Sequence, residues 1–273
     1  MNSPIQFGTS GWRGLIARDF TFENLRLAAQ GLALSLKAEL RRKKSAIHGK
    51  RPLVIIGHDT RFLGREFALA TAEVLQRAGL EPLLTNRNAP TPVIAFSIRH
   101  KKAIGGVNIT ASHNPFGYSG FKFSMPNGAG APPEFTGKIE AHAAKLLVKG
   151  WQPKTAVVGT FQCKEFDPAP AYLNRIRKLI DLKAIGKAKL RIAVELMHGT
   201  GRGYLDTLLE EAGARITRFH ENLNPLFGGG SPEPNESGMA EAANFVKSGK
   251  ADLALGLDGD ADRFGVVDKD GTW

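Results

Sequence analysis

The chain has 273 residues, of which 42% are hydrophobic, and its 37 Lys and Arg against 26 Asp and Glu give a formal net charge of +11. At roughly 100–200 residues per domain, this length predicts one large domain or two ordinary ones, each with a proper core. The apolar stretches are too short for a membrane helix, which requires about 20 residues. Cys163 is the only cysteine, so no internal disulfide can form. Residues 1–6 lack the basic and then apolar order of a signal peptide. A reducing compartment, the cytoplasm, is therefore expected.

The positive charge favours anionic partners, either nucleic acids or small phosphorylated molecules. The one dense basic run, residues 41–44, closes a predicted helix, where cations interact favourably with the helix dipole. Aromatic residues are not interleaved with this run, as they are in surfaces that stack on nucleotide bases. Nucleic-acid binding is therefore disfavoured as an interpretation.

Helical and strand patterns alternate in the first half of the chain. Apolar residues at steps of three and four predict a helix over residues 21–44, with Thr21 as its N-cap. The further predicted elements are strands at 53–57, 80–84 and 103–109, a helix at 65–78 and a short helix that ends near residue 99. The last of these strands leads directly into Ser112.

A second series of elements follows the turn-rich stretch 150–154. It comprises strands at 190–196, 215–219, 253–257 and 264–267, and helices at 203–212 and 237–247. This alternation predicts an α/β fold of two successive three-layer α/β/α domains with mixed, largely parallel sheets, spanning residues 1–154 and 155–273. Ligands of such sheets bind beyond the carboxyl ends of the strands.

An aspartate loop follows the predicted strand 253–257. It carries carboxylates at alternate positions, at Asp258, Asp260 and Asp262. Three carboxylates this close repel one another at neutral pH unless a cation compensates them. A turn at Gly259 can direct all three toward one point, which predicts an oxygen-rich site for a hard divalent ion such as Mg²⁺.

The calcium loop of an EF-hand is excluded by spacing. Counted from Asp258, the sixth position is Arg263 and the twelfth is Lys269, where that loop requires glycine and glutamate. A solvated acidic turn is the plainer alternative. Arg263 favours the metal interpretation, because a guanidinium beside a metal suits a phosphate ligand.

Ser112 lies in an irregular segment, next to His113 and Asn114, with Lys122 further on. A serine among such side chains can accept a phosphoryl group, which the cations then neutralise. The same residues also make an ordinary turn with a side-chain hydrogen bond. A serine hydrolase is disfavoured, because no acidic partner lies near His113 in sequence and no nucleophile elbow is present.

The segment 7–14 holds three glycines and Arg13. Glycines let the backbone approach an anion closely, and an arginine can bind a phosphate bidentately. The segment lacks the Gly-Lys-Ser/Thr ending of a Walker loop. A β-hairpin with a surface arginine is the alternative.

Together these segments resemble the α-D-phosphohexomutase family, which includes phosphoglucomutase and phosphomannomutase. The main similarities are FGTSGWRG at 7–14, TASHNP at 110–115 with GFKF at 120–123, and DGDADR at 258–263. HGTGRGYL at 198–205 and PEPNE at 232–236 are similar to lesser signatures of the family's second domain. The matches occur in family order and extend over nearly the whole chain.

The resemblance implies a role for each candidate residue. Ser112 would carry the phosphoryl group, and a phosphate oxygen would complete the coordination of Mg²⁺ by the three aspartates. Arg13 would stabilise the phosphoserine, with His113 and Arg263 in the surrounding shell, and Lys122 would act as general base or acid. Arg263 and Asn114 would bind substrate.

The reaction implied is reversible phosphoryl transfer between positions 1 and 6 of a hexose, through a hexose 1,6-bisphosphate. Family members have four domains, so the resemblance implies that this chain is the N-terminal half, lacks domains III and IV, and is inactive alone. It is either a fragment of a longer protein or a short natural relative. The start of the chain is more similar to the glucose and mannose enzymes. A phosphoglucosamine mutase and a non-catalytic module that binds phosphosugars or metal are the alternatives.

Overall fold

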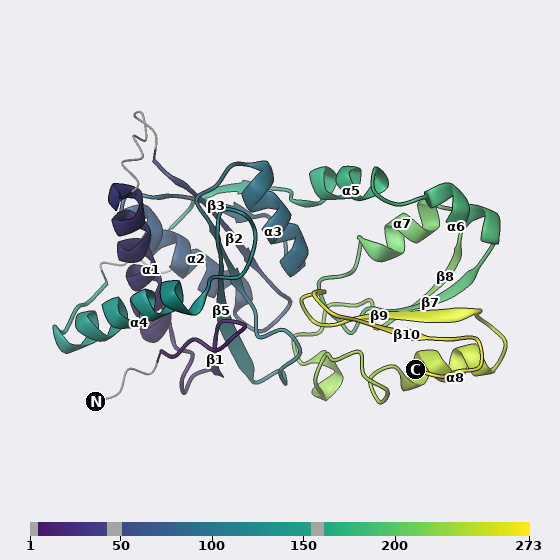
Figure 1. The fold of residues 1–273 in the computed structure, drawn as a ribbon. Coiled ribbons are helices and arrows are strands. Elements are labelled where there is room, and N and C mark those ends of the chain that lie inside the picture. Colours follow the sequence, from purple (N-terminus) through teal and green to yellow (C-terminus); the bar gives the residue numbers. More distant parts are fainter. Residues whose placement is uncertain (1–4, 43–50, 154–160) are drawn as a thin grey trace.

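The structure is a computed structural model that describes residues 5–42, 51–153 and 161–273. Figure 1 shows two α/β units, each built around its own sheet, with loops of both units meeting between the sheets. The prediction of an α/β fold with mixed, largely parallel sheets is confirmed.

The first unit contains a six-stranded sheet. In spatial order its strands are β1 (Trp12–Leu15), β5 (Tyr118–Ser124), β4 (Gly106–Ile109), β2 (Leu53–His58), β3 (Glu81–Thr85) and β6 (Lys164–Phe166). Strands β4, β2, β3 and β6 run parallel, and β5 runs antiparallel to both of its neighbours. The serine loop, residues 110–117, therefore connects a parallel strand to an antiparallel one at the carboxyl end of β4.

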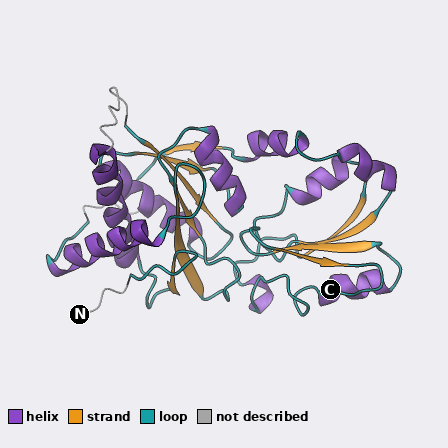
Figure 2. Ribbon diagram, viewed as in Figure 1, coloured by secondary structure: helices purple, strands orange, loops and turns teal. Residues whose placement is uncertain are grey.

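Helices cover both faces of this sheet, as Figure 2 shows. One face packs against α1 (Phe22–Arg42), α2 (Gly64–Arg77) and α4 (Pro133–Val148), and the other against α3 (Thr91–His100) and α5 (Ala169–Arg177). Side chains alternate between the two faces along a strand. On β2, Val54 and Ile56 therefore pack into the core beneath α1, α2 and α4, while Ile55 packs into the core beneath α3 and α5.

The second unit contains a four-stranded sheet. Its spatial order is β10 (Phe264–Val267), β9 (Leu253–Leu257), β7 (Arg191–Glu195) and β8 (Arg215–Phe219). Only β10 is antiparallel to its neighbour. Helices α6 (Leu182–Ala188) and α7 (Leu205–Glu211) cover one face and α8 (Ala240–Lys247) the other, and a short 3₁₀ helix, η1 (Phe227–Gly229), lies in the loop after β8.

The predicted N-cap of α1 is confirmed, since Thr21 Oγ1 accepts a hydrogen bond of 3.2 Å from Asn24 N. The helix is described through Arg42, and the last two residues of the basic run, Lys43 and Lys44, lie outside the described residues. The predicted boundary at residues 154 and 155 also lies outside them and stays a prediction. Strand β6 follows that point in the chain and yet pairs with β3, so the first sheet extends past it.

Within the described part of the chain, no helix combines the length and the apolar character needed to cross a lipid bilayer.

The crossing of α1 and α4 depends on Gly31. A Cβ at this position would lie 2.6 Å from the carbonyl oxygen of Ile139 on α4. Alanine favours helices over glycine, but here the added methyl group would force the helices apart. We expect Gly31→Ala to lower the free energy of unfolding by about 1–3 kcal/mol, the usual cost of overpacking.

The matched control is Gly137→Ala on α4, where a Cβ would meet nothing within 4 Å. That substitution is expected to raise the free energy of unfolding by roughly 0.5–1 kcal/mol. Urea unfolding of both variants measures the two values, and effects of the same sign would contradict the packing described here.

Candidate functional site

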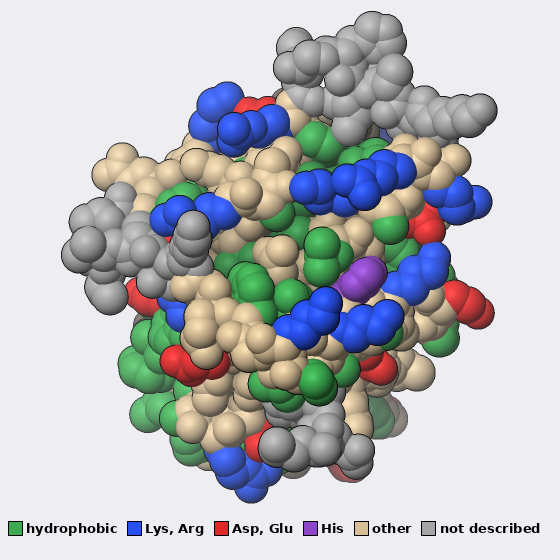
Figure 3. All heavy atoms as spheres, turned by 90° about the vertical axis from the view of Figure 1, so that its left-hand side faces the viewer, with side chains coloured by type: hydrophobic (Ala, Val, Ile, Leu, Met, Phe, Trp, Pro, Cys, Tyr) green, Lys and Arg blue, Asp and Glu red, His purple; other side chains and the backbone are tan. Residues whose placement is uncertain are grey.

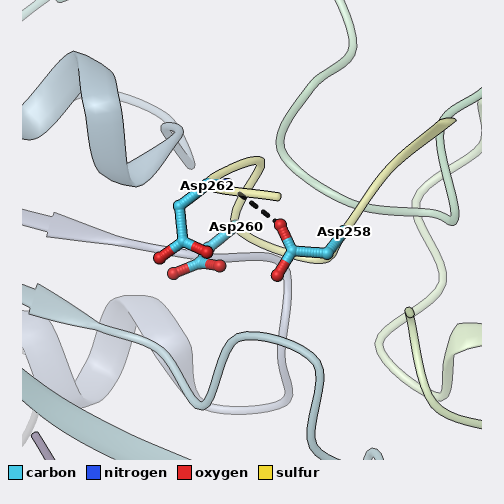
Figure 4. Close-up of side chains that lie close together, drawn as sticks. All are labelled: Asp258, Asp260 and Asp262. Atoms are coloured by element: carbon cyan, nitrogen blue, oxygen red, sulfur yellow. Dashed lines mark hydrogen bonds between the residues drawn. The ribbon is translucent and has the colours of Figure 1, made fainter. Parts of the chain in front are cut away.

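The three aspartates lie on the turn between β9 and β10, where Figure 4 shows their side chains. Each offers a carboxylate oxygen, and these oxygens lie within 4.8 Å of one another. Asp258 and Asp260 are fully buried, whereas Asp262 is exposed. Asp258 Oδ1 accepts hydrogen bonds from the backbone N–H groups of Asp262 (2.9 Å, dashed in Figure 4) and Arg263 (3.1 Å), which fixes the turn.

Backbone hydrogen bonds of Gly259 connect this turn to neighbouring loops. Its N–H donates to Pro232 O at 3.1 Å, and its carbonyl accepts from Thr200 N at 3.0 Å. A Cβ at residue 259 would lie 2.9 Å from the carbonyl oxygen of Ser112. Glycine is required here because the aspartate turn and the serine loop approach each other at backbone distance.

Asp260 connects the turn to the first unit. Its Oδ2 accepts from Thr91 Oγ1 at 2.6 Å and from Lys122 Nζ at 2.7 Å, and its backbone carbonyl accepts from Thr91 N at 2.8 Å. Its other carboxylate oxygen, Oδ1, is buried without a hydrogen-bond partner. Buried polar atoms rarely stay unpaired, so this oxygen could serve as a metal ligand.

The residues present fit a hard divalent cation. The cluster offers only oxygen ligands, one of them otherwise unpaired, as Mg²⁺ prefers. Burial, together with the charges of Asp260 and Asp262, raises the pKa of Asp258 to about 7. A bound cation would offset the repulsion among the three carboxylates.

Lys122 forms ion pairs with the cluster. Its Nζ lies 2.7 Å from Asp260 Oδ2 and 3.0 Å from Asp262 Oδ2. Burial alone would lower the pKa of Lys122, but the two carboxylates outweigh it and the pKa is raised. Burial likewise opposes ionisation of Asp260, yet Lys122 and the hydrogen bonds keep the pKa of that carboxyl lowered.

Ser112 meets the cluster from the first unit. Its hydroxyl donates to Asp258 Oδ2 at 2.9 Å, although the two residues are 146 positions apart. The residue is buried and has a φ of 55°, in the left-handed region that non-glycine residues seldom adopt. Its N–H donates to Thr110 Oγ1 at 2.9 Å. Such strained residues concentrate at functional sites.

Three basic side chains, those of Arg13, His113 and Arg263, line a recess of about 410 Å³ together with the glycine-rich segment 8–11. Burial and the neighbouring guanidinium groups of Arg263 and Arg13 lower the pKa of His113. The recess therefore combines two guanidinium groups with exposed backbone, a combination that suits a phosphate.

The structure thus gathers the predicted residues around one site. His113 Nδ1 lies 3.5 Å from Ser112 Oγ, and Arg13 Nη1 donates to the side-chain carbonyl of Asn114. Asn114 therefore orients Arg13. Arg263 lies 3.6 Å from Glu233 Oε1. The roles assigned to these residues stay predictions.

Sequence reasoning missed Thr91 and the buried pair Asp59 and Arg61, which hold the site from the first unit. A signal was present for the pair, because both charged residues lie within three positions of the end of the apolar strand β2. For Thr91, the sequence offered no signal beyond its position at the start of a helix.

Comparison with known proteins identifies the class to which this fold and site belong. A family model described as phosphoglucomutase/phosphomannomutase, alpha/beta/alpha domain I, matches residues 4–148, and the model for domain II of the same family matches residues 170–271. The chain belongs to the phosphoglucomutase/phosphomannomutase family. The predicted domain boundary lies between the two matched segments.

The relatives are named for activity on different sugars. The chain is 32% identical over 274 residues to a phosphoglucomutase/phosphomannomutase of Thermococcus kodakarensis, covering 98% of this chain and 56% of that protein. It is 29% identical over 267 residues to a phosphoglucosamine/phosphogalactosamine mutase of Sulfurisphaera tokodaii, covering 97% and 55%. A crystal structure assigned to a phosphomannomutase of Thermus thermophilus superposes with a TM-score of 0.85 at 34% identity, covering 100% and 59%. The chain spans about half the length of the curated relatives it matches.

The metal site can be tested through Asp262, whose side chain is partly exposed and lies outside the hydrophobic core, so that its replacement should not disturb the core. We expect Asp262→Asn to weaken Mg²⁺ binding by about 10–100-fold, a loss that even groups orienting a metal ligand can cause. Isothermal titration calorimetry measures the affinity. Asp268→Asn, a change at another exposed aspartate after β10, is the control, and equal affinities in the two variants would contradict the site.

Proposed function

We propose that this chain is the N-terminal half of a phosphohexomutase, a phosphoglucomutase or phosphomannomutase that moves a phosphoryl group between positions 1 and 6 of a hexose. The observation that carries the proposal is the 2.9 Å contact between Ser112 Oγ and Asp258 Oδ2. It brings a hydroxyl that can carry phosphate to a three-carboxylate cluster that can hold Mg²⁺. Family membership supports the same reaction class.

In the proposed step, Ser112 Oγ attacks a phosphoryl group of a hexose 1,6-bisphosphate. The Oγ–P bond forms, the P–O bond to the sugar breaks, and the serine proton ends on the sugar oxygen that leaves. The phosphoserine then gives its phosphoryl group to the free hydroxyl of a hexose monophosphate: the Oγ–P bond breaks, a P–O bond to the sugar forms, and the hydroxyl proton ends on Ser112 Oγ. Accepting the phosphoryl group at one position and losing one from the other converts the 1-phosphate and the 6-phosphate into each other. Such transfers depend mostly on positioning and on neutralising charge, which is what these residues supply.

Each side chain has a proposed part in this chemistry. Mg²⁺ bound by the three aspartates would supply positive charge at the phosphoryl oxygens. Arg13 and His113, at the wall of the recess, would stabilise the phosphoserine. Lys122 would transfer the proton of the sugar hydroxyl, and Arg263 and Asn114 would contact the substrate.

The sugar and the rest of the protein are part of the proposal. Two further domains are expected in the full-length protein, to hold the sugar and its distal phosphate, and the cytoplasm is the expected location. A phosphoglucosamine mutase is the second candidate, because a relative with a similar degree of identity carries a phosphoglucosamine/phosphogalactosamine name. A hexose bisphosphate would serve as activator in either case.

The basic surface does not favour a nucleic acid. Figure 3 shows Lys and Arg side chains spread over one face among hydrophobic and other polar side chains. On α1, which belongs to this side of the molecule, Glu39 pairs with both Arg42 and Lys138. Charges that are dispersed and partly paired make a weak phosphate-binding surface.

Phosphorylation of Ser112 tests the proposal. Incubation of the purified chain with glucose 1,6-bisphosphate and Mg²⁺ should add one phosphoryl group, which intact-mass spectrometry and phosphopeptide mapping should locate at Ser112. Ser112→Ala should abolish the addition, and Ser248→Ala, at the exposed end of α8, should retain it. The chain alone is expected not to convert glucose 1-phosphate, because the proposed sugar-holding domains lie outside it.

Absence of phosphate from Ser112 after incubation with each bisphosphorylated hexose would refute the proposed transfer. Phosphorylation by glucosamine 1,6-bisphosphate but not by the glucose or mannose compound would favour the second candidate.

A further inference from the structure

Arg61, three residues after the end of β2, has a fully buried guanidinium group with every donor satisfied. Its side chain and that of Asp59 both have a relative exposure of 0%. An arginine side chain carries five N–H donors in a fixed planar fork. Nε donates to Asp59 Oδ2 at 3.0 Å, and the remaining four donors all reach backbone carbonyl oxygens.

The four carbonyls belong to one short stretch, the serine loop and the start of β5. Nη2 donates to the oxygens of Ser112 and Asn114, both at 2.6 Å. Nη1 donates to those of Pro115 (2.8 Å) and Tyr118 (3.0 Å). Carbonyl dipoles directed at one point repel one another, so this loop conformation requires a cation with several donors at its centre.

Asp59 holds Arg61 in place and reaches Ser112 by a second route. Its Oδ1 accepts from Arg61 N at 2.9 Å, and its Oδ2 accepts from Thr110 Oγ1 at 2.6 Å as well as from Arg61 Nε. Thr110 Oγ1 in turn accepts from Ser112 N at 2.9 Å. Both the N–H and the carbonyl of Ser112 are therefore tied to the same buried ion pair.

The second unit also contacts this guanidinium group. The ring of Phe227, in η1, is buried and lies with its centroid 4.9 Å from Arg61 Cζ. A guanidinium over an aromatic face is a favourable contact, and more so where water is excluded. Arg61 thus contacts the loop that carries the serine and the unit that carries the aspartates.

We propose that Arg61 is a positioning residue that holds Ser112 in its left-handed conformation and so keeps the serine hydroxyl against the metal cluster. The effect of Arg61 on phosphoryl transfer rests on the proposed function; its effect on the loop does not. Lysine cannot replace it, because an ammonium has three donors on a single atom and cannot span four carbonyls.

The test compares Arg61→Lys with Arg65→Lys, a control one turn further on whose guanidinium is partly exposed and pairs with Glu165. In Arg61→Lys, the amide hydrogens of residues 112–114 and 116–118 should exchange at least about tenfold faster, the effect of losing one charged hydrogen bond. Exchange in β2 and α1 should be unchanged. Wild-type protection of residues 112–114 and 116–118 in a folded Arg61→Lys would overturn the proposal.

The second readout is the rate of Ser112 phosphorylation by glucose 1,6-bisphosphate with Mg²⁺. Arg61→Lys should lose about 100-fold, the cost of a misplacement of about 1 Å. If wild-type Ser112 takes no phosphoryl group, the proposed function fails, whereas the exchange comparison still tests Arg61.

Chemical rescue separates positioning from a general loss of stability. In Arg61→Ala, millimolar guanidinium should restore much of the phosphorylation rate, and methylammonium at the same concentration should not, because only the former reproduces the planar fork. A folded Arg61→Ala that transfers at the wild-type rate, or one that neither cation restores, would overturn the proposal. If Arg61→Ala does not fold, Arg61→Lys carries the test through both readouts.

Discussion

The site depends on one contact, the hydrogen bond from the hydroxyl of Ser112 to the carboxylate of Asp258 across the junction of two sheets. If the serine loop and the aspartate turn lay far apart, neither would by itself suggest phosphoryl transfer. Two features enforce their approach: the paired hydrogen bonds between Thr91 and Asp260, and the absence of a side chain at Gly259. The carboxyl ends of strands from both sheets thereby supply one site, as expected for α/β folds.

Charge balance explains why this junction suits phosphate. Buried carboxylates are costly, and here a lysine, backbone N–H groups and a serine hydroxyl compensate them, with one oxygen of Asp260 unpaired. On the neighbouring wall, Arg13 and Arg263 present positive charge to the recess. A phosphoryl group between the two surfaces would contact a bound cation on one side and guanidinium groups on the other. The arrangement favours a ligand that carries both negative charge and metal-binding oxygens.

The sequence predicted much of this architecture from local patterns. The predicted strands 215–219, 253–257 and 264–267 coincide with β8, β9 and β10, because short apolar runs between turns are well defined in sequence. Helix α4 was not predicted, since the prolines at its start and Gly137 within it obscure its periodicity. The sequence offered a signal for the pair of Asp59 and Arg61 but not for its contacts with the serine loop, because the other partners of Arg61 are backbone carbonyls that any residue provides, more than 50 positions away. Side-chain motifs identify chemistry, whereas backbone recognition becomes visible only in the folded chain.

The most direct test of this account is the distance between a metal in the aspartate cluster and phosphorus on Ser112. Mn²⁺ can replace Mg²⁺ in oxygen-rich sites, and its unpaired electrons report nearby nuclei. Electron–nuclear double resonance on the phosphorylated chain with bound Mn²⁺ should show a strong ³¹P hyperfine coupling, as for a phosphate oxygen bound directly to the metal, and Ser112→Ala should lack it. Mn²⁺ bound at the three aspartates with no ³¹P coupling to phosphoserine 112 would contradict the account.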